Sequence, residues 1–236
     1  MRNTIRTGIV IAVTGVLLCG SGRASFNKSS LRKDDTIVFL GDSITKAGVR
    51  PNGYVTLTSQ AIAKAYPDLN IKVIGAGISG NKVPNCQKRL DRDVLQKKPT
   101  IVLIYIGIND VWHWGRDRGT KKEVFEAGLK DMISKINAVG ARVILCTPTV
   151  IGEKADGTNE FDTMLDEYSD ISRNVAKETN SQLLDLREAF LTHLEEHNTE
   201  NAEKGILTKD SVHLNNNGNA FLSQLVLNAL NVPTAD

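Results

Sequence analysis

Five short apolar runs, each followed by a segment with helical periodicity, restrict the fold of this chain more than any other feature. Strands that are apolar at every position suit a parallel sheet covered on both faces, and the intervening helices supply those covers. The pattern predicts an α/β fold: a three-layer α/β/α sandwich with a five-stranded, mainly parallel sheet and right-handed crossovers. The expected strands cover residues 36–40, 71–74, 101–106, 142–146 and 183–186.

The clearest expected helix covers residues 121–139. Thr120 and Glu123 have the spacing of a capping box at its start, and Gly140 predicts its C-terminal stop. Its apolar stripe consists of Phe125, Leu129, Met132, Ile133 and Ile136.

Two further helices are expected around residues 161–175 and 221–229, and the second of these ends before Pro233. The chain shows no internal repeat, no low-complexity linker and no break in composition. Residues 25–236 are therefore expected to form a single domain.

The first 24 residues have the three-part pattern of a secretory signal peptide. Arg2 and Arg6 stand before an apolar run. Gly22 and Ala24 then supply small residues at the −3 and −1 positions of a cleavage site. We expect cleavage after Ala24. The apolar run of about 12 residues is shorter than the roughly 20 that span a bilayer, so an uncleaved membrane anchor is the less favoured interpretation.

Cys19 leaves another interpretation of this segment open, a lipoprotein anchored through that cysteine, although Leu18 is bulkier than the residue expected before a lipidated one. Removal of residues 1–24 takes away three arginines and changes the formal charge from +2 to −1. A charge so close to neutral argues against a nucleic-acid-binding protein. Export also argues against kinase chemistry, because ATP is absent outside the cell. The expected location is secreted or periplasmic.

Three cysteines are too few for a disulfide framework, and their spacing matches no zinc motif. Cys86, Leu90 and Val94 share one stripe at helical spacing, so Cys86 is expected in the core. Cys146 ends an apolar strand and is expected there too. A disulfide between Cys86 and Cys146 after export stays open but is not favoured. The sequence indicates no metal and no cofactor.

Four short polar motifs follow expected strands or precede the last helix, where ligands of open parallel sheets bind. Each alone has an inert interpretation: a helix-capping serine, a flexible glycine loop, an Asx turn and a solvated histidine. Together they supply a serine nucleophile, a base, an orienting carboxylate and oxyanion donors, the parts that acyl transfer needs. The motifs are Gly41-Asp42-Ser43-Ile44, Ser79-Gly80-Asn81, Gly107-Ile108-Asn109-Asp110 and Asp210-Ser211-Val212-His213.

These motifs make the sequence similar to the SGNH hydrolases, also called GDSL esterases and lipases, over essentially the whole mature chain. The resemblance implies a flavodoxin-like SGNH hydrolase fold and a serine esterase. It implies that Ser43 is the nucleophile, His213 the general base and later acid, and Asp210 the residue that holds the imidazole tautomer. It also implies an oxyanion hole formed by the backbone N–H groups of Ser43 and Gly80 and the side-chain amide of Asn109.

The aromatic segment after Asn109 has two interpretations of equal weight. Trp112, His113 and Trp114 line the substrate cleft, where a tryptophan stacks on a sugar ring or receives an acyl chain, or they anchor a loop through partly buried rings. Two other histidines, His193 and His197, are expected on a solvated, charged helix face.

The hypothesis from the sequence is an exported serine esterase for short-chain esters, with acetyl groups on carbohydrate favoured. An aromatic content of 5% and the lack of a long apolar insertion argue against a lipase for long-chain fat. A lysophospholipase or thioesterase is the alternative enzyme, and a non-catalytic carbohydrate-binding protein is the alternative of another class. The expected partner is a small-molecule or carbohydrate ester, with no nucleic acid and no stable membrane insertion after signal cleavage.

Overall fold

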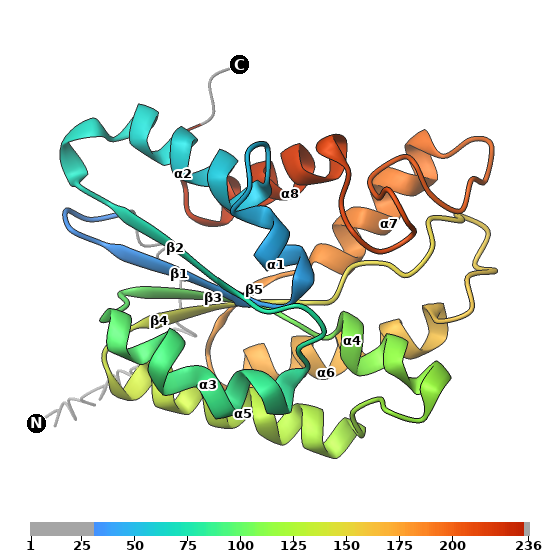
Figure 1. Cartoon of the computed structure of the whole chain (residues 1–236), viewed down its shortest axis with the longest axis horizontal. Coiled ribbons are helices and arrows are strands. Elements are labelled where there is room, and N and C mark those ends of the chain that lie inside the picture. Colours follow the sequence, from blue (N-terminus) through green and yellow to red (C-terminus); the bar gives the residue numbers. More distant parts are fainter. Residues whose placement is uncertain (1–30, 234–236) are drawn as a thin grey trace, which may run out of the picture.

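The computed structural model describes residues 31–233, in which a five-stranded sheet lies between two layers of helices (Figure 1). All strand pairs are parallel, in the order β2-β1-β3-β4-β5. The strand order changes direction between β1 and β3, and ligands of open α/β sheets bind at the carboxyl ends of strands at such a point. The predicted fold class is confirmed. The strands are β1 (Thr36–Gly41), β2 (Lys72–Gly77), β3 (Ile101–Tyr105), β4 (Arg142–Cys146) and β5 (Gln182–Leu184).

The helices divide between the two faces of the sheet (Figure 1). One layer holds α1 (Ser43–Gly48), α2 (Tyr54–Ala65), α7 (Leu186–His197) and α8 (Asn216–Ala229). The other layer holds α3 (Val83–Asp93), α4 (Ile108–Trp112), α5 (Lys122–Ala138) and α6 (Asp162–Glu178). Short 3₁₀ turns occupy Pro67–Leu69, Leu95–Lys97 and His113–Arg116.

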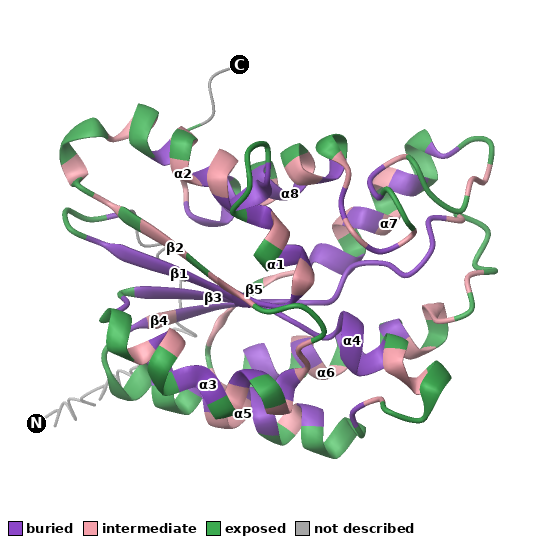
Figure 2. Ribbon diagram, viewed as in Figure 1, coloured by how far each residue is buried: buried purple, intermediate pink, exposed green. Residues whose placement is uncertain are grey.

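Burial separates the central strands from the edge strands (Figure 2). Every residue of β1 and β3 is buried, whereas β2 and β5 are only partly covered. The prediction that all five strands are buried on both faces is therefore wrong for the two edges, where the helix layers end. Leu183 of β5, for example, is 38% exposed.

The strand β2 continues three residues beyond its predicted end, through Gly75 and Gly77. The expected strand ended at residue 74. Glycine is needed because α1 packs directly on this part of the strand: a Cβ on Gly77 would stand 2.2 Å from the backbone nitrogen of Lys46. The small residues thus bring the start of α1 close to the carboxyl end of the sheet.

The predicted capping box of α5 is wrong. Its N-cap is Lys121, and Thr120 lies one residue too early to cap. The backbone N–H of Thr120 donates to the carbonyl of Asp110, and its side chain lowers the pKa of the Asp110 carboxyl. The predicted stop is correct, because Gly140 directly follows the C-cap residue with a φ of +82°.

Cys86, Leu90, Val94 and Cys146 are all buried, and both cysteines are free thiols, as expected for core residues. Burial raises the pKa of the Cys86 thiol to about 12. The predicted signal peptide and the Cys19 lipidation alternative lie outside the described residues. Among the residues that are described, no helix is both long and apolar enough to cross a membrane.

Candidate active site

Ser43 is the first residue of α1, directly beyond the end of β1. The helix is capped by Asp42, whose Oδ1 accepts a hydrogen bond of 2.9 Å from the N–H of Ile44, so Ser43 is not the N-cap. Gly41 allows the strands to approach here, because a Cβ would stand 2.6 Å from the carbonyl oxygen of Tyr105. The Ser43 hydroxyl is therefore free of a capping role, at the carboxyl edge of the sheet.

A continuous hydrogen-bonded chain joins Ser43 to two residues from the other end of the sequence. Ser43 Oγ lies 2.9 Å from Nε2 of His213, although 170 positions separate them. His213 Nδ1 lies 3.0 Å from Oδ2 of Asp210. With Nδ1 donating to the carboxylate, Nε2 has a lone pair for the serine proton. The predicted nucleophile, base and orienting acid thus lie within hydrogen-bonding distance of one another, in that order.

The half-exposed carboxyl of Asp210 has a pKa below its usual value. Partial burial alone would raise that pKa, but hydrogen bonds from the His213 backbone and ring outweigh the burial. The His213 N–H donates to Oδ1 of Asp210 over 2.7 Å. Asp210 is therefore ionised near neutral pH. The His213 N–H holds its carboxylate, and the carboxylate orients the His213 ring.

Asn109 connects the three loops that carry the predicted oxyanion donors. It is only 4% exposed. Its Nδ2 donates to Oδ2 of Asp42 at 3.2 Å and to the carbonyl of Asn81 at 3.1 Å. Since Asp42 precedes Ser43 and Asn81 follows Gly80, the amide is bonded to a sequence neighbour of each of the other two predicted donors, and both of its N–H groups are engaged. Asn109 does not cap α4, because Gly107 is the N-cap of that helix.

Gly80 has the backbone conformation that an exposed N–H at a tight turn requires. Its φ is +74°, which favours glycine. The space where a Cβ would stand is open, with no described heavy atom within 4 Å. The N–H of Ser43 is also available, because N–H groups in the first turn of a helix have no partner within that helix. Both backbone groups meet the chemical requirement for oxyanion donors.

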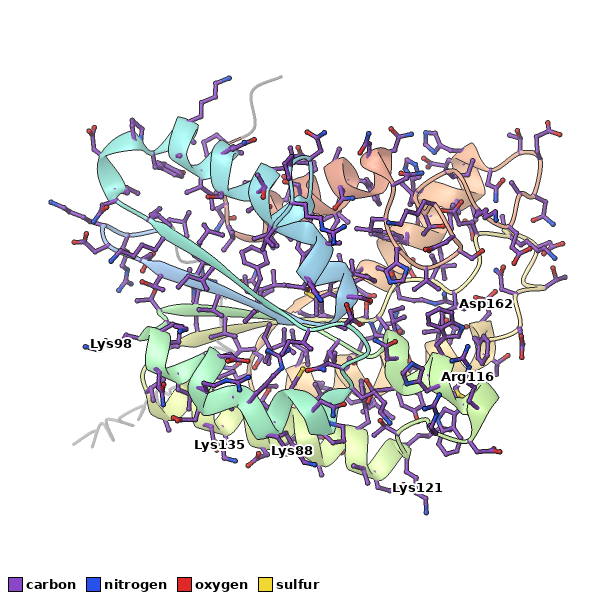
Figure 3. All side chains as sticks on the ribbon, viewed as in Figure 1. Lys88, Lys98, Arg116, Lys121, Lys135 and Asp162 are labelled. Atoms are coloured by element: carbon purple, nitrogen blue, oxygen red, sulfur yellow. The ribbon has the colours of Figure 1, made fainter. Side chains whose placement is uncertain are left out.

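Arg89 of α3 supports this side of the site, and the sequence analysis missed it. It is 7% exposed, while its neighbour Lys88 projects outward (Figure 3). Its guanidinium donates to the carbonyls of Gly41 and Ala76, at the ends of β1 and β2, both over 2.8 Å. Its Nε donates over 2.7 Å to Oδ1 of Asn81. The only hint in the sequence is its position on the apolar stripe of α3, three residues after Cys86.

Two buried acids lie beneath the oxyanion donors. Burial raises the pKa of Asp42 to about 7, against the lowering effect of the Ile44 N–H. Burial also raises the pKa of Asp110 to about 6, although the N–H of Val83 donates to it over 3.1 Å. The charge of Asp110 raises the pKa of Asp42 further, and the charge of Arg89 lowers it. This side of the site is thus a buried polar network.

The aromatic segment divides between the two interpretations given above. Trp114 is an anchor: its Nε1 lies 3.2 Å from the hydroxyl of Tyr168, and its ring covers Gly119, where a Cβ would stand 2.2 Å from the indole. Trp112 is 38% exposed and lies next to the half-buried ring of His113. Burial lowers the pKa of His113, and the nearby Lys82, Arg118 and Arg116 lower it further.

A cavity of about 390 Å³ opens beside Asp210, with Trp112 in its wall, and neither Ser43 nor His213 is among its lining residues. Asp210, Ser211 and Val212 form one side of the cavity, and the segment after β4 forms another. Its lining combines apolar and aromatic groups with charged and amide side chains. The lining residues used below are Trp112, Phe161, Lys154, Asn159 and Glu160.

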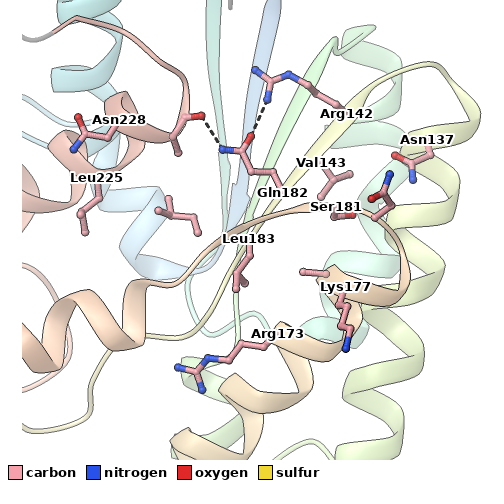
Figure 4. A pocket seen from close by; sticks show the side chains of 14 residues that line it. Asn137, Arg142, Val143, Arg173, Lys177, Ser181, Gln182, Leu183, Leu225 and Asn228 are labelled. Carbon is pink, nitrogen blue, oxygen red and sulfur yellow. Dashed lines mark hydrogen bonds between the residues drawn. The ribbon is translucent and has the colours of Figure 1, made fainter. Parts of the chain in front are cut away.

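A larger cavity of about 740 Å³ lies elsewhere, at the β5 edge of the sheet between α6 and α8 (Figure 4). Gln182 crosses it, accepting from Arg142 over 3.1 Å and donating to the carbonyl of Ala229 over 2.8 Å. None of the triad residues lines this cavity. Size therefore does not identify the site, whereas the chemistry at Ser43 does.

The two histidines that were expected on a solvated helix face, His193 and His197, lie on α7, away from Ser43. His193 and His197 stack with their ring centroids 4.1 Å apart. His197 is exposed, as expected, but His193 is half-buried against Phe221 because α8 packs beside α7. Within residues 31–233 no group of three His, Cys, Asp or Glu side chains is arranged to hold a metal ion.

The family model described as "GDSL-like Lipase/Acylhydrolase family" matches residues 39–221, which include all four motifs. The chain belongs to the GDSL-like lipase/acylhydrolase family. This GDSL-type chain is 34% identical over 175 residues to an acetylxylan esterase of Geobacillus stearothermophilus, covering 66% of this chain and 78% of that protein. The resemblance inferred from the motifs is confirmed, and the chain is a carboxylic ester hydrolase.

Solved structures agree with this assignment. The GDSL-type chain is similar to the crystal structure of an acetyl xylan esterase, AlAXEase, with a TM-score of 0.81 and 42% identity, over 83% of this chain and 99% of that one. It is also similar to LAE5, described as an alpha/beta hydrolase enzyme from the metagenome of Lake Arreo, Spain. That match has a TM-score of 0.78 and 26% identity, over 87% of this chain and 99% of the other.

Proposed function

We propose that the protein is an exported serine esterase that removes short acyl groups, acetyl in particular, from carbohydrate through an acyl-enzyme intermediate. The observation that carries this proposal is the chain of contacts from Ser43 Oγ through His213 to Asp210. A hydroxyl, an imidazole and a carboxylate in this order are the parts that activate a serine for attack on an ester.

In the proposed reaction, Ser43 Oγ attacks the ester carbonyl and His213 Nε2 takes the hydroxyl proton. The negative charge that develops on the carbonyl oxygen is received by the N–H groups of Ser43 and Gly80 and by one N–H of the Asn109 amide, which exchanges its contact with the Asn81 carbonyl for the oxyanion. His213 then protonates the leaving alcohol, which departs and leaves an acyl group on Ser43. A water molecule, deprotonated by His213, attacks this acyl-enzyme and releases the acid.

The cavity beside Asp210 supports a carbohydrate as the alcohol part of the ester. The exposed ring of Trp112 offers a flat apolar face of the kind on which sugar rings stack. Lys154, Asn159 and Glu160 add hydrogen-bonding groups suited to hydroxyls. The similarity to acetylxylan esterases points to the same class of substrate. A lysophospholipase or thioesterase would instead need an apolar channel for its acyl chain.

Residues 1–24 support export, through the signal-peptide pattern alone. The secreted protein should begin near Ser25 and carry no lipid. Intact mass and N-terminal sequencing of naturally exported protein test this, and a diacylated N-terminus at Cys19 would favour the lipoprotein alternative instead.

A hydrolysis panel tests the reaction and its substrate class. Acetylated xylo-oligosaccharides and p-nitrophenyl acetate should be hydrolysed faster than long-chain p-nitrophenyl esters, lysophospholipid or acyl thioesters. Ser43→Ala should abolish turnover, and an organophosphonate should label Ser43 alone. Ser134→Ala, on the exposed face of α5, is the matched control and should keep full activity. Full activity in Ser43→Ala would refute the mechanism, and a preference for long acyl chains would refute the substrate class.

A further inference from the structure

Glu153 is a buried carboxylate that the proposed reaction does not use. It follows β4 by seven positions and has no exposed surface. No cation within residues 31–233 forms an ion pair with it. A carboxylate taken out of water without a partner is costly, so its surroundings must supply strong hydrogen bonds.

Those bonds come from three consecutive backbone N–H groups. The N–H of Ile206 donates to Oε2 of Glu153 over 2.8 Å, and the N–H of Leu207 donates to Oε1 over 2.8 Å. Thr208 also donates its N–H to Oε1. Hydrogen bonds to an ionised acceptor are roughly twice as strong as neutral ones. One side chain therefore fixes three successive residues that belong to no helix or strand.

These three residues lead directly into the turn of residues 209–213, which carries Asp210 and His213. The segment that contains Thr208 runs antiparallel to the segment that contains Leu214, where the two residues form an isolated β-bridge. The N–H of Lys209 donates to the carbonyl of His213 over 2.9 Å. Asp210 and His213 thus stand at the two ends of a closed turn, and Ser211 at its tip has a φ of +72°. Whatever holds the stem of this turn also holds the imidazole.

The backbone around Glu153 binds the same turn at other points. The N–H of Gly152 donates to the carbonyl of Ser211 over 2.8 Å, at the tip of the turn. The N–H of Glu153 donates to the carbonyl of Glu203 over 2.9 Å, before the stem begins. Because β4 belongs to the same sheet as β1, this short segment connects the turn to the sheet edge that carries Ser43.

We infer that Glu153 is a positioning residue for the general base. Its carboxylate binds the backbone of residues 206–208 and thereby sets the distance between His213 Nε2 and Ser43 Oγ. The inference rests on the proposed function, in which His213 takes the serine proton. Loss of the carboxylate would leave all three triad side chains present. The turn that carries Asp210 and His213 would, however, be free to shift relative to α1.

The test replaces Glu153 by glutamine, which has the same shape but one acceptor oxygen and no charge. Glu153→Gln should lower kcat on p-nitrophenyl acetate by about 10²-fold, because a misplacement of about 1 Å can cost that much. The KM should change little, since Glu153 does not line the cavity. Phosphonate labelling of Ser43 should slow in parallel. The downfield proton resonance of the His213–Asp210 hydrogen bond should broaden or disappear.

Two control variants separate the possible causes. Leu129→Ala, on the buried face of α5, should lower the melting temperature without changing kcat per folded molecule. His213→Ala should be inactive. If His213→Ala retains activity, the proposed reaction fails. If it is inactive while Glu153→Gln keeps full kcat per folded molecule and an unchanged resonance, the inference about Glu153 is wrong.

A measurement on the unaltered protein covers the case in which Glu153→Gln does not fold. Backbone hydrogen exchange should be slow at the amides of residues 206–208, although Ile206 is only half-buried. Exchange at these amides as fast as at exposed loop residues would mean that the carboxylate does not hold them, and would overturn the inference. Glu153→Asp keeps both acceptor oxygens on a shorter side chain and is the second variant. Exchange that is slow in the unaltered protein and faster in Glu153→Asp supports the inference.

Discussion

The two sides of Ser43 each contain an aspartate, in opposite surroundings. Asp42, on the oxyanion side, is buried, and burial raises its pKa to about 7. Asp210, on the base side, is half-exposed, and its pKa is lowered because hydrogen bonds from His213 outweigh partial burial. The exposed acid is the one that must carry charge in the proposed reaction. The buried acid has a structural position, where it accepts hydrogen bonds from Ile44 and Asn109.

The residues that support the two sides also differ, in the sign of their charge. The oxyanion side is held by a buried cation, Arg89, which donates to carbonyl oxygens at the ends of β1 and β2. The base side is held by a buried anion, Glu153, which accepts from backbone N–H groups of residues 206–208. Gly41 and Ala76 present carbonyl oxygens to Arg89, whereas residues 206–208 present N–H groups to Glu153. The sign of each supporting charge follows from the backbone that it must satisfy.

The largest expected effect is on the base side. Asp210→Asn should lower kcat by about 10³- to 10⁴-fold, because an amide in place of the carboxylate favours the wrong imidazole tautomer. The oxyanion donors remain, so activity above the uncatalysed rate should persist. Steady-state kinetics on p-nitrophenyl acetate measure the effect. A loss below tenfold would show that Asp210 does not set the tautomer.

The next effect is on the oxyanion side. Asn109→Ala should lower kcat and kcat/KM alike by about 10²- to 10³-fold, with KM nearly unchanged, because its amide matters most when charge develops in the transition state. Melting temperature and kinetics are measured together. A variant that melts early but keeps normal kcat per folded molecule would make Asn109 a purely structural residue.

A smaller effect is expected for Arg89, which supports the oxyanion side. Arg89→Lys keeps the charge but cannot reach both strand ends and Asn81 at once. We expect a loss of about tenfold in kcat, below the roughly 10²-fold that a full 1 Å misplacement can cause, together with a lower melting temperature. Arg92→Lys, on the exposed face of the same helix, is the control and should be neutral. Equal behaviour of the two variants would remove Arg89 from the oxyanion side.

The last comparison concerns stability and pH. Because the pKa of Asp42 is raised to about 7 in the folded protein, the folded state holds this proton more tightly than the unfolded state does. The contribution of Asp42 to the free energy of unfolding should therefore fall as pH rises from about 4 to about 7, by at most about 1.4 kcal/mol per pH unit, and then level off.

Asp42→Asn should remove this dependence, so the difference in free energy of unfolding between wild type and variant should move in the variant's favour as pH rises. Urea denaturation between pH 4.5 and 8 measures it. Asp210→Asn, whose parent acid has a lowered pKa, should give no such trend over this range. A difference that does not change with pH would show that Asp42 is ionised throughout.

The sequence by itself determined the fold class and the four motifs of the site. Alternating apolar runs and helical stripes are local patterns, so the order of strands and helices could be predicted, and so could the stop of α5 at Gly140. The order of Ser43, Gly80, Asn109, Asp210 and His213 identified the chemistry. Local signals failed in two places: β2 extends through Gly75 and Gly77 because α1 packs on it, and Lys121 rather than Thr120 is the N-cap of α5.

Only the tertiary structure decided what holds the site together. Glu153 binds backbone groups 53 to 55 positions away, and Arg89 reaches Gly41 across 48 positions. Such bonds involve backbone atoms that every residue possesses, so they leave no residue pattern at either end. Hydrophobic periodicity reports which face of an element is buried, but not which buried charge meets which unsatisfied strand end or turn. That pairing exists only once the sheet has brought the loops to one edge.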